Sequence, residues 1–125
     1  MQSVDETLEL KLGELLRLHG WRLAVAESCT GGLIGHRITN VAGSSTYYMG
    51  SITAYAYEAK VRLLGVRWET LEQHGAVSRE TVLEMARGVR LALAADIGMA
   101  VSGIAGPSGG TPEKPVGLTC IGLST

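Results

Sequence analysis

Apolar side chains recur every three to four residues in two long stretches of the chain, the spacing of a helix with one buried face. The first stretch runs to about His19, and Gly20 marks its end. Its apolar positions are Leu8, Leu12, Leu15 and Leu16, and the run Ser3-Val4-Asp5-Glu6 before it has the spacing of a capping box. The second stretch begins after Ser78, a favourable N-cap residue, and runs to about Ala95. Both stretches predict amphipathic helices.

Shorter apolar runs between these helices predict strands. Residues 23–26, 51–57, 97–102 and 116–123 are each apolar or alternate β-favouring side chains. Helical spacing returns over 33–40, 58–64 and 69–74. Helices that alternate with buried strands indicate a single α/β domain, with three α/β/α layers around a largely parallel or mixed sheet.

The turn after the first predicted strand is a candidate for chemistry. Residues 27–32 are small, polar or glycine, with Ser28, Cys29 and Thr30 at the corner before a helix. The first N–H groups of a helix lack intrahelical partners and can bind a phosphate or an oxyanion. A structural alternative stays open, in which Ser28 or Thr30 only caps the helix and the glycines only permit a tight turn.

Composition and charge exclude several kinds of partner and site. The chain has 125 residues with 11 Lys+Arg and 12 Asp+Glu, a net charge of -1, which gives no electrostatic footprint for nucleic acid. Cys29 and Cys120 form neither a metal-ligand spacing nor a disulfide framework, so we expect no metal and a reduced, cytoplasmic protein. No apolar run is long enough to span a bilayer, and no membrane partner is expected. The 17 glycines, gathered near the polar turns, indicate close approach of the backbone to a ligand.

Four ordered motifs carry a family resemblance over nearly the whole chain. They are Ala26-Glu27-Ser28-Cys29-Thr30-Gly31-Gly32, Tyr55 with Glu58-Ala59-Lys60-Val61, His74-Gly75-Ala76-Val77-Ser78, and Gly103-Ile104-Ala105-Gly106-Pro107 running into Gly110-Thr111-Pro112-Glu113-Lys114-Pro115-Val116-Gly117. In these the chain resembles the CinA C-terminal domain family, the nicotinamide-nucleotide amidohydrolases. The resemblance implies hydrolysis of nicotinamide mononucleotide to nicotinate mononucleotide and ammonia, with no cofactor.

The resemblance also implies roles for particular residues. Ser28 would be the nucleophile, assisted by Lys60 and Tyr55. Lysine can act as a base when burial lowers its pKa, and the N–H groups of Thr30 and Gly31 would hold the oxyanion. The remaining predicted substrate-binding residues are Gly32, Gly103, Ile104, Ala105, Gly106 and Thr111.

The chain departs from the family pattern in two places. Tyr57 stands where the family commonly has asparagine, which would alter the pocket wall. The sequence also stops at Thr125, before the family's last strand and C-terminal helix. An uncovered sheet face demands a cover, so we expect a homo-oligomer, a dimer, and lower stability than in a longer chain.

Two other functions remain open. Cys29 could replace Ser28 as the nucleophile, as in glutamine amidotransferases, although no histidine partner is evident. Alternatively, the chain could be a non-catalytic nucleotide-binding module of a larger protein, with its glycine loops and helix N-terminus binding phosphate.

Overall fold

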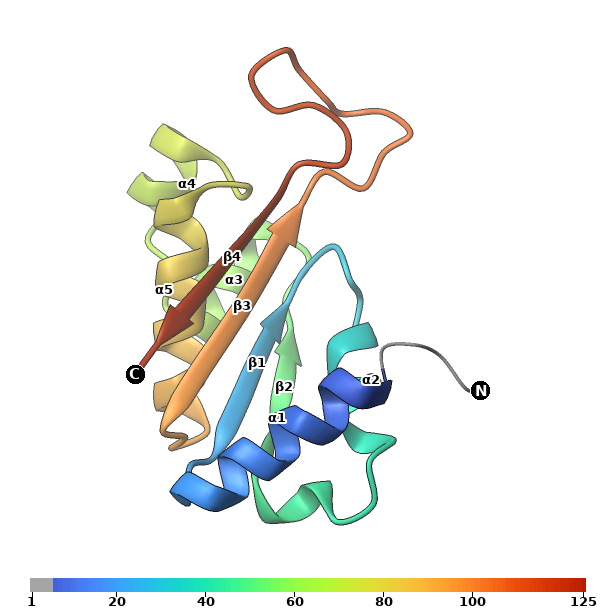
Figure 1. Cartoon of the computed structure of the whole chain (residues 1–125). Coiled ribbons are helices and arrows are strands. Elements are labelled where there is room, and N and C mark those ends of the chain that lie inside the picture. Colours follow the sequence, from blue (N-terminus) through green and yellow to red (C-terminus); the bar gives the residue numbers. More distant parts are fainter. Residues whose placement is uncertain (1–5) are drawn as a thin grey trace.

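The computed structural model describes residues 6–125 and contains one four-stranded mixed sheet (Figure 1). The strands are β1 (Leu23–Glu27), β2 (Tyr48–Thr53), β3 (Ile97–Gly103) and β4 (Thr119–Ser124). Their order across the sheet is β2-β1-β3-β4; β1 pairs in parallel with both β2 and β3, and β4 is antiparallel to β3. The predicted α/β class is confirmed, with β1 in the interior of the sheet.

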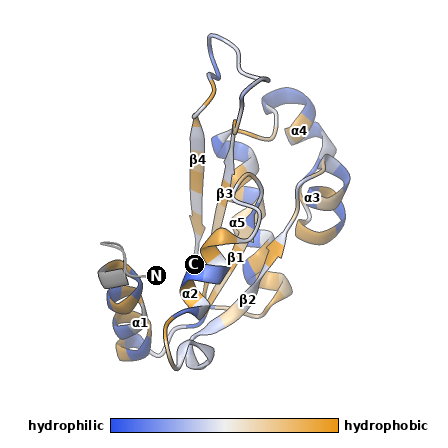
Figure 2. Cartoon of the chain, turned by 90° about the vertical axis from the view of Figure 1, so that its right-hand side faces the viewer, coloured by the Kyte–Doolittle hydropathy of each residue, from blue (hydrophilic) through white to orange (hydrophobic). Residues whose placement is uncertain are grey.

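Helices cover the two faces of this sheet. Figure 2 shows α1 (Glu6–His19) on one side of the sheet and α3 (Tyr57–Leu64), α4 (Trp68–His74) and α5 (Arg79–Ala92) on the other. The helix α2 (Leu33–Thr39) follows β1, and a 3-10 turn, η1 (Ser44–Thr46), leads into β2. Gly65 ends α3 in the left-handed conformation, and the Ser78 hydroxyl caps α5 by accepting from the Thr81 N–H, as the sequence predicts.

The two faces of β1 contribute to two separate apolar clusters. All five of its residues are buried. Ala24 and Ala26 pack with the helices α3, α4 and α5, while Leu23 and Val25 pack with α1 and α2. Successive side chains of a strand point to opposite faces. The next two residues of the chain, Glu27 and Ser28, therefore continue onto opposite faces of the sheet.

Several predicted boundaries are wrong by a few residues. The predicted strand over 51–57 is β2 at Tyr48–Thr53, so Tyr55 and Tyr57 lie beyond the strand. The reason is that β2 pairs with a five-residue β1, and the ladder ends where Thr53 meets Glu27. The long helix stops at Ala92 and not near Ala95, and the last strand is shifted to Thr119–Ser124. The predicted capping box over residues 3–6 falls largely outside the described residues.

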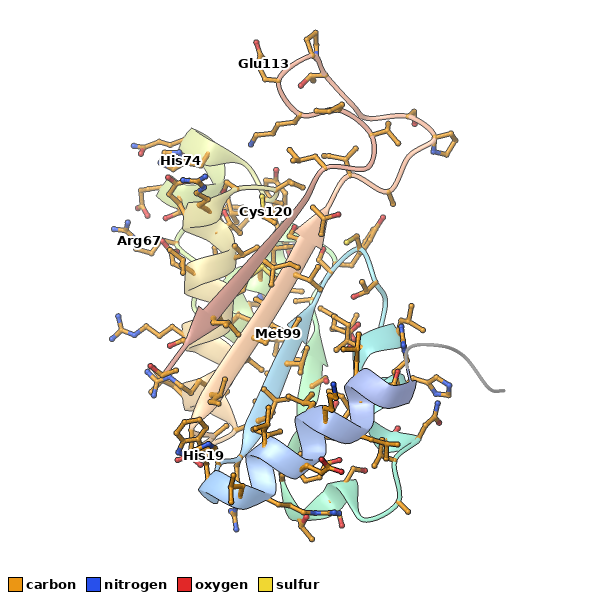
Figure 3. The ribbon with its side chains drawn as sticks, in the orientation of Figure 1. His19, Arg67, His74, Met99, Glu113 and Cys120 are labelled. Carbon is orange, nitrogen blue, oxygen red and sulfur yellow. The ribbon has the colours of Figure 1, made fainter. Side chains whose placement is uncertain are left out.

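On the face of the sheet that α1 covers, β4 carries exposed apolar side chains. Ile121 and Leu123 are 64% and 63% exposed. Leu123 also lines an apolar cavity of about 500 Å³ beneath α1, together with Met99, which Figure 3 places on the sheet. The predicted dimer and the predicted missing C-terminal segment would each cover such a face, and both stay predictions.

Across residues 6–125, none of the helices combines the length and the apolar character that crossing a membrane would require.

Candidate active site

Ser28 lies at the carboxyl end of β1, in the turn that leads to α2. Its side chain is buried, and its N–H donates to the Val101 carbonyl of the neighbouring strand β3. The turn is closed by the Gly31 N–H, which donates to the Ser28 carbonyl at 3.1 Å. Gly31 and Gly32 have φ values of 62° and 107°, which glycine adopts without strain. The glycines are therefore required by the backbone of this turn.

Lys60 contacts Ser28 from a different part of the chain, the helix that follows β2. It lies near the start of α3, and only 1% of its surface is exposed. Its Nζ is 3.0 Å from Ser28 Oγ, 2.9 Å from the Ala54 carbonyl oxygen and 2.8 Å from the Tyr55 carbonyl oxygen. The structure thus brings together two residues that are 32 positions apart in the sequence.

These three contacts determine where the N–H donors and the lone pair of a neutral Lys60 amine point. Carbonyl oxygens only accept hydrogen bonds, whereas a serine hydroxyl both donates and accepts. A neutral amine has two N–H donors and one lone pair, so the two carbonyls take the donors and the lone pair faces the Ser28 hydroxyl. Burial lowers the pKa of Lys60 below its ordinary value, and the nearby Cys29 opposes this by raising it. The arrangement suits a general base.

Cys29 lies in the same turn, next to the end of β3. A Cβ atom built on Gly103 would lie 3.0 Å from Cys29 Sγ, and also 3.0 Å from the Leu118 carbonyl oxygen. Gly103 therefore permits close packing of the β1 turn against the end of β3. Within residues 6–125, the hydrogen bonds of Lys60 Nζ go to Ser28 and two carbonyls and not to Cys29. This geometry favours Ser28 over Cys29 as the nucleophile.

Tyr55 contributes its backbone to the site and points its side chain outward. Its carbonyl oxygen accepts from Lys60 Nζ, but its side chain is 73% exposed. It does not lie on a strand leading to Lys60, because β2 ends at Thr53. The catalytic role that the resemblance assigns to its phenol stays a prediction.

The loop between β3 and β4 extends beyond the carboxyl ends of β1 and β3 (Figure 1). Its base is closed by the Ile104 N–H, which donates to the Leu118 carbonyl, and by the Gly117 N–H, which donates to the Ile104 carbonyl. Gly106 has a φ of 78°, and a Cβ there would lie 2.5 Å from a methyl carbon of Val116, so the two limbs of the loop pack closely. Ala105 is exposed.

Thr111 belongs to the outer part of the same loop. Its N–H donates to the Lys114 carbonyl, and its hydroxyl accepts from the Lys114 N–H at 3.0 Å. Figure 3 places Glu113, inside this turn, at the far end of the loop. Lys114 Nζ donates to the carbonyl oxygen of His74, which connects the loop to the end of α4. A substrate-binding role for Ile104, Ala105, Gly106 and Thr111 stays a prediction.

Glu27 is a functional candidate that the sequence analysis did not single out. Its side chain is 0% exposed, and its carboxylate accepts four hydrogen bonds, all from the turn and α2. The N-cap of α2 is Gly32, without a side-chain cap, so the alternative in which Ser28 or Thr30 caps the helix is wrong. Glu27 takes that role from six residues before the helix, a spacing that no N-cap pattern contains.

The hydrogen bonds of the turn also show which N–H groups are free for an oxyanion. Gly31 donates to Ser28, and Gly32 donates to Glu27 at 3.1 Å, so both of these N–H groups are engaged. The predicted use of the Gly31 N–H for an oxyanion therefore does not fit this structure, because that N–H closes the turn. In the described part of the chain, the N–H groups of Cys29 and Thr30 have no acceptor. These two neighbouring N–H groups directly follow Ser28, where the residue after a nucleophile supplies an oxyanion donor in other hydrolases.

Among the described residues, the hydrogen bonds of Ser28 do not go to any of the three histidines. His19 stacks on Trp21 at the end of α1, His36 is exposed on α2, and His74 Nδ1 is 3.7 Å from a Glu80 carboxylate oxygen at the start of α5. Within residues 6–125 there is no group of three or more His, Cys, Asp and Glu side chains placed to hold a metal ion. Lys60 is therefore the basic side chain that faces the Ser28 hydroxyl.

Fold and site together define a three-layer α/β domain with a buried serine–lysine pair at the carboxyl end of its sheet. The model of the CinA C-terminal domain family matches residues 5–125 of this chain. The chain belongs to the CinA C-terminal domain family, as the sequence motifs predict.

Named relatives agree with this assignment. The chain is 59% identical over 117 residues to a CinA-like protein of Desulfosudis oleivorans, covering 94% of this chain and 28% of the relative. It is 53% identical over 123 residues to a CinA-like protein of Chloroherpeton thalassium, covering 98% and 29%. The chain thus spans less than a third of the length of the curated relatives that it matches.

Solved structures resemble the whole fold. The competence/damage inducible protein CihA from Agrobacterium tumefaciens superposes with a TM-score of 0.94 at 42% identity, over 98% of this chain and 74% of that one. The competence damage-inducible protein A from Klebsiella pneumoniae gives a TM-score of 0.92 at 38% identity, over 97% and 75%.

Proposed function

We propose that this domain hydrolyses the carboxamide of nicotinamide mononucleotide to nicotinate mononucleotide and ammonia. The observation that carries the proposal is the buried Lys60, whose Nζ lies 3.0 Å from Ser28 Oγ and is also held by two carbonyl oxygens. Amide hydrolysis by serine requires a base of this kind, because a serine hydroxyl is a weak nucleophile at its free pKa. The substrate comes from the resemblance to the nicotinamide-nucleotide amidohydrolases.

In the proposed first step, Ser28 Oγ attacks the carboxamide carbon while its proton passes to the lone pair of Lys60. The negative charge that forms on the carboxamide oxygen is held by the N–H groups of Cys29 and Thr30. Donors fixed in this way stabilise the transition state most at the atom where charge develops. The ammonium of Lys60 then returns the proton to the leaving nitrogen, and ammonia departs. Tyr55, which the resemblance gives an assisting role, would relay this proton: its phenol takes a proton from Lys60 as it gives its own to the leaving nitrogen.

The first step leaves a nicotinoyl ester on Ser28. In the second step, Lys60 removes a proton from a water molecule, and the resulting hydroxide attacks the ester carbon. Collapse of this second intermediate releases nicotinate mononucleotide and returns the proton to Ser28 Oγ. Both steps use the same base, and neither requires a redox change.

The alternative of a non-catalytic nucleotide-binding module receives less support from the geometry. That hypothesis relied on the glycine loops and on free N–H groups at the start of α2. The Glu27 carboxylate already accepts from the N–H groups of Gly32, Ile34 and Gly35 there. A binding module also gains nothing from a lysine that is buried against a serine hydroxyl, where removal of the charge from water is unfavourable.

Ammonia release from nicotinamide mononucleotide tests the proposal. We expect the wild-type chain to release ammonia, Ser28→Ala to release none, and Cys29→Ala to keep most of the activity. Binding of the nucleotide by Ser28→Ala, measured by calorimetry, shows that the site is intact. Wild-type protein that binds the nucleotide but releases no ammonia would support the binding module instead, and loss of activity in Cys29→Ala alone would assign the nucleophile to Cys29.

A further inference from the structure

The carboxylate of Glu27 lies behind the catalytic turn, on the face of β1 opposite to Ser28. Oε1 accepts from the Thr30 hydroxyl at 2.6 Å, from the Gly32 N–H at 3.1 Å and from the Ile34 N–H at 3.0 Å. Oε2 accepts from the Gly35 N–H at 2.9 Å. One side chain therefore holds both the middle of the turn and the first residues of α2.

Close packing of α2 against the sheet brings the backbone of Gly35 to this carboxylate. Gly35 faces β2 so closely that a Cβ would lie 2.5 Å from Tyr48 Oη and 2.9 Å from Ser51 Oγ. The same Cβ would lie 3.5 Å from Glu27 Oε2. A glycine at position 35 lets α2 approach the sheet until its N–H reaches the carboxylate.

The backbone of Glu27 is hydrogen-bonded to the segment that holds Lys60. Its carbonyl oxygen accepts from the Ala54 N–H at 2.9 Å. Ala54 in turn supplies one of the two carbonyl oxygens that hold Lys60 Nζ. Glu27 is thus connected to Ser28 through the turn and to Lys60 through Ala54, although its carboxylate accepts no hydrogen bond from either side chain.

We propose that Glu27 is a positioning residue for the Ser28–Lys60 pair. Its carboxylate fixes the turn so that Ser28 Oγ faces Lys60 and the N–H groups of Cys29 and Thr30 stay free. The inference rests on the proposed function, and it adds a residue that touches neither the substrate nor the reacting atoms. Misplacement of reacting groups by about 1 Å can lower a rate about 10²-fold, so a loosened turn should be visible in kcat.

The variant Glu27→Gln tests this inference. The amide oxygen of glutamine can replace only one of the two carboxylate oxygens. The NH₂ group takes the place of the other, so it faces a hydrogen-bond donor of the turn or α2, and neither of these two donors has an acceptor. We expect kcat to fall about 10²-fold while KM changes little, because the substrate contacts remain. A neutral Lys60 is the proposed base, so kcat should rise with pH as Lys60 loses its proton. The midpoint of that rise should not move in Glu27→Gln, because Lys60 stays buried and keeps its two carbonyl contacts.

The chain offers a matched control in Glu84. Its carboxylate also holds the start of a helix, accepting from the Arg67 N–H at 2.9 Å and from the Thr70 hydroxyl at 2.6 Å, but at α4. Glu84→Gln should lower the melting temperature without lowering kcat. A Glu27→Gln protein that is fully folded at the assay temperature and has the kcat of Glu84→Gln would overturn the inference.

A second pair of variants covers the case in which Glu27→Gln does not fold. Thr30→Val removes one of the four donors to the carboxylate, and Thr30→Ser keeps it. We expect a smaller loss of kcat in Thr30→Val, with recovery in Thr30→Ser. Equal and wild-type kcat values in both variants would contradict a positioning role.

Labelling of Ser28 by a fluorophosphonate probe separates this inference from the proposed function. The probe reports an activated serine whether or not nicotinamide mononucleotide is the substrate. If the wild type is labelled at Ser28 but releases no ammonia, the proposed substrate is wrong. The inference then stands if Glu27→Gln is labelled about 10²-fold more slowly than Glu84→Gln, and it fails if the two are labelled equally fast.

Discussion

Replacement of Lys60 tests the proposed base directly. Lys60→Met keeps a long apolar side chain of similar length but removes the amine, and with it the contacts to Ser28 Oγ and to the Ala54 and Tyr55 carbonyls. A positioned acid–base group contributes about 10²–10⁴-fold in rate, which corresponds to about 3–5 kcal/mol of activation free energy. Lys60→Arg should be equally inactive, because a guanidinium does not lose its proton at the assay pH.

The proposed role of Lys60 also predicts the direction in which kcat changes with pH. Burial lowers the pKa of Lys60, and the unprotonated amine is the base, so kcat should rise with pH through that lowered pKa. The residual activity of Lys60→Met should lack this rising limb. The assay is ammonia release over a pH series, at a temperature where each variant is folded, with the exposed α1 residue Lys11 changed to Met as the control. Wild-type-like rates in Lys60→Arg, or a rising limb that persists in Lys60→Met, would refute the reasoning.

Two further changes test the site and its scaffold. Tyr55→Phe should lower kcat with little change in KM, because it removes the phenol but keeps the ring and the carbonyl that accepts from Lys60; an unchanged kcat in steady-state assays would limit Tyr55 to its carbonyl. Gly88→Ala should lower the free energy of unfolding by about 1–3 kcal/mol, since a Cβ there would collide with the Leu64 carbonyl between α5 and α3. Denaturant titration that finds equal stability would show that α3, which carries Lys60, is not packed as described.

The fold was largely predictable because its signals are local. Helical spacing located α1 and α5, and short apolar runs located β1 and β3 almost to the residue. The error at β2 has a physical cause: residues 54–56 have the small and aromatic side chains of a strand pattern, yet β1 has ended and offers them no ladder partner. The end of a parallel strand is set by its neighbour, and its own sequence does not contain that information.

The candidate site was predictable only in part. Motif resemblance pointed to Ser28 and Lys60, and the structure places their side chains in contact. The carbonyls of Ala54 and Tyr55 carry no signal in the sequence, because every residue has one. Glu27 could have been noticed as an acid that ends a buried apolar strand, since a charge in that place requires partners. Its four donors, however, come together only when the turn folds back over it.

Acylation of Ser28 during amide hydrolysis is the step on which the proposed function depends most. The most direct measurement is rapid quenching of the wild-type chain with nicotinamide mononucleotide at low pH, followed by mass analysis of the peptide that contains both Ser28 and Cys29. We expect a nicotinoyl group on Ser28 that forms at the rate of the first ammonia release and is absent in Ser28→Ala. A nicotinoyl thioester on Cys29, or turnover in Ser28→Ala at the wild-type rate, would contradict it.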